Sequence, residues 1–154
     1  MAITTNAICN SFKKELLQGS HDFDASTDTY KLAMYNSSAT LGKSTTNYAT
    51  NPGGGSDTEV TSSGYVAGGK ALVNQGVKMS SSVAITNFAN LSFVGVTLTA
   101  RGALIYNTTT NGGSGTNSAV CVLDFGADKT ATAGTFTVQF PAPTSTAAIL
   151  RISG

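Results

Sequence analysis

The sequence predicts an all-β protein, an antiparallel β-sandwich with jelly-roll-like connections and one N-terminal α-helix. Residues 135–140 alternate apolar with polar side chains, which is the period of a half-buried strand. Residues 119–125 are almost wholly apolar, as in a strand in the middle of a sheet. Helical spacing of apolar residues is convincing in one segment, 5–18. The later elements are short and separated by turn residues, which favours a sandwich over an alternating βαβ fold.

The length of 154 residues indicates a single domain, 1–154, with enough chain for a buried core. Two glycine-rich stretches, 42–57 and 108–118, are expected to be long surface loops. The triplet 53–55 is followed by neither a Gly-Lys-Ser/Thr motif nor a helix, so it does not predict a phosphate site. We expect neighbouring subunits to order both loops and the N-terminal segment.

Capping signals flank the expected helix 5–18. Thr4 or Thr5 can cap its start, and Gly19 can end it. Apolar residues recur every four positions and form one stripe, which consists of Ile8, Phe12 and Leu16. We expect this stripe to cover one face or one end of the sheet. The charged residues Lys13, Lys14 and Glu15 are expected to face elsewhere, with Glu15 and Lys14 as a pair on the helix surface.

The segment 21–28 is expected to be a turn built by aspartate side chains. Asp22, Asp24 and Asp28 are spaced as in some metal-binding loops, but the glycine and the final glutamate of an EF-hand are missing. The sequence therefore predicts Asx-turns in place of a metal site. His21 is the single histidine and has no nucleophile beside it in sequence, so we expect it to be a hydrogen-bonded structural residue.

The middle of the chain predicts several short strands. The first, 29–35, alternates apolar and polar residues, and a short edge strand is expected to begin at Glu59. Two further strands, 70–77 and 79–86, are expected on either side of a break near Gly76.

The sheet is expected to be organised around one pair of strands, 98–107 and 119–125. Gly102 interrupts the first strand, which indicates a bulge or a close approach of two backbones. The segment 126–134 is expected to connect this pair to the strand 135–140, and a last strand is expected at 147–152. We predict that eight side chains share one core: Leu104, Tyr106, Val120, Val122, Phe125, Phe136, Val138 and Phe140.

Charged residues are scarce on this chain. They make up 11% of the sequence against a usual share of about a quarter. The formal net charge is +1 and no basic run occurs, so we expect no nucleic-acid partner. Residues 1–6 lack the pattern of a signal peptide, and no stretch has the length of a transmembrane helix. We therefore expect folding in a cytoplasm, no membrane partner, and free thiols at Cys9 and Cys121.

Seven segments outside the two glycine-rich loops carry a resemblance to a known family. They are FKKELL (12–17), HDF (21–23), YKLAMY (30–35), RGALIYN (101–107), AVCVLDFGADK (119–129), FTVQFP (136–141) and AILRI (148–152). Together they resemble the small virion structural proteins of tailed bacteriophages. The resemblance implies a component of the phage particle with no enzymatic activity, which folds in the host cytoplasm and is then bound in the virion.

The function expected from this resemblance is capsid decoration, in which the protein acts as a cement on the head shell. Its partners would be the major capsid protein and copies of itself. A tail, neck or head-fibre component is the alternative within the virion. A carbohydrate-binding β-sandwich module is a further alternative, with Tyr48 and Tyr65 as candidate binding residues. No cofactor, metal or catalytic residue is predicted. The aspartate-rich turn lacks the EF-hand glycine and glutamate, and no nucleophile elbow accompanies His21.

Overall fold

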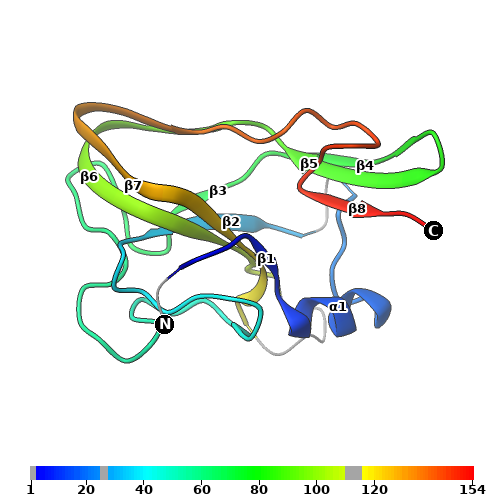
Figure 1. Cartoon of the computed structure of the whole chain (residues 1–154), viewed down its shortest axis with the longest axis horizontal. Helices are drawn as coiled ribbons and strands as arrows, with labels where there is room; N and C mark the ends of the chain where they lie inside the picture. Colours follow the sequence, from blue (N-terminus) through cyan, green and yellow to red (C-terminus); the bar gives the residue numbers. More distant parts are fainter. Residues whose placement is uncertain (1–2, 25–27, 110–115) are drawn as a thin grey trace.

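The computed structural model describes residues 3–24, 28–109 and 116–154. In this part of the chain, eight antiparallel strands form two sheets and one helix lies near the N-terminus (Figure 1). The elements are β1 (Ala7–Ile8), α1 (Asn10–Leu17), β2 (Tyr30–Tyr35), β3 (Lys70–Ala71), β4 (Asn74–Ser80), β5 (Val83–Phe88), β6 (Leu91–Asn107), β7 (Ser118–Val138) and β8 (Leu150–Ile152). The larger sheet has the order β1-β7-β6-β2-β3 and the smaller sheet β4-β5-β8. The predicted all-β, sandwich-like fold with one N-terminal helix is confirmed.

β6 and β7 form one long antiparallel ribbon. The expected central pair is part of it, with Gly102 opposite Asp124 and Asn107 opposite Ser118. In Figure 1 the ribbon leaves the sheet that contains β2, turns sharply, and runs back across the molecule toward β5. Its register shifts several times between Phe93 and Gly102, and such bulges increase the bend and twist of a ribbon. Both strands belong to the five-stranded sheet, and their bent arms extend from β2 toward the smaller sheet.

The segment 126–134, which was expected to be a connection, is instead part of β7. Its residues pair with β6, as Thr130 does with Thr99, and 2.8 Å separates the two threonine hydroxyl oxygens. Gly126 has a φ of +78° and marks the point where the composition resembles a turn. The pairing with β6 overrides this local signal, because strand formation depends strongly on the neighbouring strand.

Gly102 lies where two backbones approach closely, as its position within a strand predicted. A Cβ atom built on it would lie 2.4 Å from the carbonyl oxygen of Leu123 and 3.0 Å from Cδ1 of Ile3. The register also shifts between Ala100 and Gly102. A side chain at this position would force β6 away from β7 or displace the N-terminal segment.

The break between the two predicted middle strands lies at Ser81 and not at Gly76. β4 and β5 form a hairpin that turns at Ser81, which has a φ of +55°. Gly76 lies inside β4 at a register shift, with a φ of +76° that glycine adopts at low cost. The edge strand expected at Glu59 is reduced to a single bridge with Tyr35, and the last strand begins later than expected, at Leu150.

The N-terminal helix is shorter than the expected 5–18. It spans Asn10–Leu17, and Cys9 occupies the N-cap position in place of Thr4 or Thr5. The helix starts late because the two residues of β1 pair with β7, which holds them in an extended conformation.

The expectation that Glu15 faces solvent beside Lys14 is wrong. Glu15 is 2% exposed, and it lies with Phe12 on the buried side of α1. Of the predicted apolar stripe, Phe12 is buried and Leu16 packs partly buried against the core, whereas Ile8 belongs to β1. The helix therefore buries an acidic residue among its apolar ones, and this residue needs a polar partner.

All eight predicted core residues contact a single core. Six of them are buried, whereas Phe125 and Phe140 are partly buried and pack against the others. The core also contains Cys9 and Cys121, and both are free thiols. Of the two expected loops, 42–57 contributes an isolated bridge, from Asn47 to Ser118. Residues 110–115 of the second loop lie outside the described part of the chain.

Candidate functional site

The two candidate sugar-binding residues, Tyr48 and Tyr65, meet at one buried carboxylate. Glu59 is 5% exposed. Its Oε2 accepts a hydrogen bond of 2.7 Å from the Tyr48 hydroxyl, and its Oε1 accepts one of 2.7 Å from the Tyr65 hydroxyl. The backbone N–H of Gly68 also donates to Oε1, at 2.7 Å. Three donors on one carboxylate compensate for much of the cost of burying it.

Tyr106 completes this group, which we call the Glu59 cluster (Tyr48, Glu59, Tyr65, Gly68 and Tyr106). Its ring stacks on that of Tyr48 with centroids 4.6 Å apart, and its hydroxyl donates to the carbonyl oxygen of Gly68 at 2.6 Å. Desolvation, together with the nearby Glu59 carboxylate, raises the pKa of Tyr106 to about 12. Burial also raises the pKa of Tyr48 and Tyr65, so all three hydroxyls keep their protons and act as donors.

The Glu59 cluster is closed by its own hydrogen bonds. Tyr65 is buried, and its hydroxyl accepts a bond of 2.9 Å from the backbone N–H of Met34 while it donates to Glu59. Tyr48 is half-buried and has one ring face against Tyr106. A sugar would need a free ring face with free polar partners around it. The geometry therefore assigns both tyrosines to anchoring the loops that carry them.

His21 lies in a second buried cluster, which we call the His21 network (Glu15, His21, Asp28 and Asn107). The Nε2 atom of His21 is 2.7 Å from Oε2 of Glu15, and its Nδ1 atom is 3.1 Å from Nδ2 of Asn107. Nδ2 of Asn107 also donates to Oδ2 of Asp28 at 2.6 Å, and its Oδ1 accepts the backbone N–H of Thr109 at 2.9 Å. The amide nitrogen of Asn107 is a donor, so Nδ1 of His21 acts as the acceptor. The ring N–H is therefore at Nε2, and it donates a hydrogen bond to the Glu15 carboxylate.

The His21 network has a structural role. A catalytic triad needs a hydroxyl or thiol at the second nitrogen of the imidazole, and here that position holds the amide of Asn107. The contacts join α1, the turn after it and the end of β6. The predicted Asx-turn is present, since Oδ1 of Asp22 accepts the backbone N–H of Asp24 at 2.7 Å. Within the described residues, no group of three or more potential metal ligands occurs.

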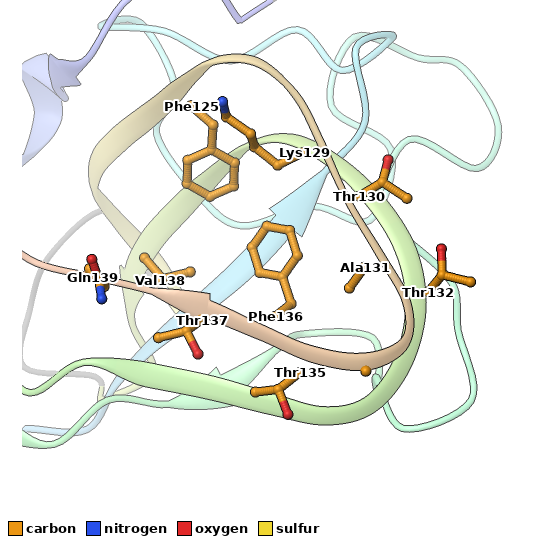
Figure 2. A pocket seen from close by; sticks show the side chains of 11 residues that line it. Phe125, Lys129, Thr130, Ala131, Thr132, Thr135, Phe136, Thr137, Val138 and Gln139 are labelled. Carbon is orange, nitrogen blue, oxygen red and sulfur yellow. The ribbon is translucent and has the colours of Figure 1, made fainter.

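The first open feature is a hollow of about 510 Å³ within the bend of β7 (Figure 2). Phe125 and Phe136 extend into it from the two arms of the strand, with ring centroids 5.9 Å apart. Thr130 and Thr132 point away from the two rings. The interior of the hollow is therefore mainly aromatic, with the Lys129 side chain extending beside Phe125, whereas the threonine side chains of β7 point outward.

The second open feature is a cleft of about 580 Å³ between α1 and the smaller sheet, which we call the helix–sheet cleft. Its apolar walls include Phe12, Leu16, Leu17, Val77, Leu150 and Ile152. Leu17 is 91% exposed and Ile152 is 62% exposed, so the walls face solvent in part. The sequence patterns did not predict this cleft. The one available signal was Leu17, an apolar helix residue outside the predicted stripe.

Comparison with protein-family models, curated proteins and solved structures found no match to this chain. In the described part of the chain, no helix has the length and hydropathy needed to span a membrane. The Glu59 cluster and the His21 network are closed by internal contacts, whereas the hollow and the helix–sheet cleft are open to a ligand or a partner.

Proposed function

We propose that this protein is a structural component of a tailed-bacteriophage virion and acts as a decoration or cement protein on the head. It binds the outer surface of the assembled shell in several copies and has no catalytic role. Its partners are the major capsid protein and further copies of the chain. The proposal starts from the family resemblance of seven sequence segments, which include the central strand segments 101–107 and 119–129.

The observation that carries this proposal is where the exposed apolar side chains lie. Large apolar residues are exposed on or beside the smaller sheet, namely Val73, Val77, Met79 and Ile152, and Leu17 is exposed on α1. β4 and β8 are the two edges of that sheet in the described chain. Exposed apolar side chains next to open strand edges are typical of surfaces that associate with other chains.

The exposed apolar side chains of this surface suit a cement protein because apolar contacts depend little on charge. Apolar contacts and main-chain hydrogen bonds at strand edges are weak one by one, but repetition over a symmetric shell gives tight retention. A protein that binds the assembled shell and not the free subunits stabilises the shell by mass action. Salt should weaken this retention only slightly, since screening acts mainly on exposed charges.

The test is to strip the protein from purified particles, heat stripped and intact particles side by side, and then add the protein back. A cement requires that stripped heads release their DNA at a lower temperature and that added protein restores the intact value. Stripped heads that are equally stable but fail to join tails or to attach to cells would support the tail, neck or fibre alternative. Absence of the protein from purified particles would reject both roles.

The carbohydrate-binding alternative is favoured by one observation, the aromatic hollow within β7. Phe125 is half-buried and Phe136 lines the same hollow, which has space for a sugar ring beside the phenyl groups. If this role is correct, host surface polysaccharide should shift the NMR signals of Phe136, and Phe125→Ala should abolish that shift. Tyr48→Phe serves as the control, because Tyr48 belongs to the closed Glu59 cluster.

A further inference from the structure

We propose that the helix–sheet cleft receives an extended segment of a different protein, in which apolar residues alternate with acidic ones, and that this segment adds as a strand to the free edge of β8. The inference goes beyond the proposed function. It rests on the cleft itself and holds whether or not the chain belongs to a virion.

The walls of the helix–sheet cleft fit the apolar side of such a segment. One wall is a face of the smaller sheet, on which Ala84 pairs with Ile152 and Thr86 pairs with Leu150. The other wall is α1, with Phe12 at its base and Leu17 at its rim. An apolar side chain from every second residue of a strand could enter between these walls.

The edge of β8 supplies the main-chain partner. In the described chain, β8 (Leu150–Ile152) pairs with β5 on one side and with no strand on the other. Figure 1 shows β8 on the side of the smaller sheet that is nearer to α1, and residues of both elements line the same cleft. An added strand would therefore satisfy the free backbone groups of β8 while its side chains fill the cleft.

Charge selects an acidic partner. Lys13 lies on α1, and Arg151 lies between Leu150 and Ile152 in β8, so its side chain projects from the sheet face opposite to theirs. The acidic side chains of an added alternating strand would point to that same face while its apolar side chains enter the cleft. Each cation makes its hydrogen bond to a neutral group: Nζ of Lys13 donates to Oδ1 of Asn10 at 3.1 Å, and Nη1 of Arg151 donates to the carbonyl oxygen of Ser145 at 2.8 Å. The sequences of β4, β5 and β8 contain no aspartate or glutamate. Oδ1 of Asp22, the one carboxylate among the lining residues, accepts the backbone N–H of Asp24. The side chains of Lys13 and Arg151 beside the β8 edge are thus available to an acidic segment.

The shape of the cleft and the charge pattern of the chain favour another protein over a membrane or a second copy. A flat lipid surface can contact the rim residues Leu17 and Ile152, but it does not enter a concave cleft. The exposed acids of the chain are Asp24, Asp57 and Asp128. Asp24 belongs to a short alternating stretch, Asp22-Phe23-Asp24, but Phe23 is buried in the core of the chain itself, so this stretch is not available as an added strand for a second copy.

The test uses the full chain labelled with ¹⁵N and a synthetic peptide that alternates valine with glutamate. A matched peptide alternates valine with lysine, and a third alternates serine with glutamate. We expect saturable shifts at Leu17 and at Leu150–Ile152 with the valine–glutamate peptide, and affinity for it at least about tenfold above that for either other peptide. The double variant Lys13→Glu and Arg151→Glu should reverse the preference between the two valine peptides. Lys129→Glu, an exposed charge on β7, is the matched control and should change nothing.

Four outcomes would overturn the proposal. The first is the absence of saturable shifts with all three peptides, and the second is equal affinity for the two valine peptides. The third is binding of phosphatidylglycerol vesicles through the same residues in place of the peptides, which would identify a membrane surface. The fourth is dimerisation that Ile152→Asp abolishes, which would identify a second copy. These measurements need no particles, so their failure is distinguishable from failure of the cement role.

Discussion

The Glu59 cluster gives the sharpest test of how this fold is held together. The variant Glu59→Ala removes the acceptor of three hydrogen bonds at once. The Tyr65 hydroxyl and the Gly68 N–H are buried, and a buried donor left without an acceptor costs about 1–3 kcal/mol. The Tyr48 hydroxyl is closer to solvent and can bond to water. We therefore expect Glu59→Ala to lower the free energy of unfolding by about 4 kcal/mol.

Urea denaturation followed by circular dichroism measures this loss, with the slope of the transition checked for two-state behaviour. Tyr65→Phe should cost about 2–3 kcal/mol, because the Glu59 carboxylate loses a buried donor and the Met34 N–H loses its buried acceptor. Tyr48→Phe is the matched control and should cost about 1 kcal/mol, since it removes one half-exposed bond. A loss below about 1 kcal/mol for Glu59→Ala, or equal losses for the two tyrosine variants, would refute this reasoning.

Three further predictions concern the backbone, the helix and the response to pH. Gly69→Ala should prevent folding, because the new Cβ would lie 1.8 Å from the carbonyl oxygen of Leu32 at a φ of +71°. Gly54→Ala is the control: Gly54 has a φ of +81° but no atom near its Cβ position, so this variant should cost about 1 kcal/mol. Equal effects of the two variants on the urea midpoint would contradict the close packing at Gly69. Glu15→Ala should cost about 2–4 kcal/mol in the same assay, because it leaves the buried His21 ring without its acceptor. Lys14→Ala should cost less than about 0.5 kcal/mol. Similar losses for the two variants would disprove the His21 network. Desolvation raises the pKa of Cys9 from 9.0 to about 12, so the stability that its buried thiol contributes should be complete below pH 9 and lost as the pH rises toward 12. Urea midpoints measured across this range should therefore fall less steeply for Cys9→Ala than for the unchanged protein. Parallel curves for the two proteins would show that Cys9 ionises freely in the fold.

The local pattern of apolar and polar residues was sufficient to predict strands that are buried on one face or on both faces. The strand that became β2 and the central pair of β6 and β7 were found because their apolar residues match the period of a strand. The prediction failed at 126–134, where alanine, threonine and glycine resemble a turn but the backbone pairs with β6. It also failed at Gly76, where a glycine with positive φ marks a bulge and not an end. Both errors arise because pairing with a distant strand is not visible in a local window.

The clusters were harder to predict than the strands, because their members are far apart in sequence. Glu15 and Asn107 both contact His21, yet Asn107 lies 86 positions from it. The sequence indicated Tyr48 and Tyr65 as exposed aromatic residues, but both hydroxyls donate hydrogen bonds to the buried Glu59 carboxylate. No sequence motif around Glu59 predicted this contact. Glu15 follows Lys13 and Lys14, so its neighbours in sequence indicated a solvent-facing position, and its buried partner became visible only in the fold.

The positions of the carboxylates explain why the smaller sheet carries cations without acidic neighbours. Two of the eight acidic residues, Glu15 and Glu59, are buried inside hydrogen-bonded clusters, and the span 60–123 contains none. The smaller sheet is built from that span and from the last residues of the chain, so its cations have no acidic neighbour within the sheet. A surface that was merely polar would not gather exposed apolar residues and uncompensated cations at the same end of the molecule. This coincidence makes Arg151 and Ile152 the first residues to substitute in a search for the partner.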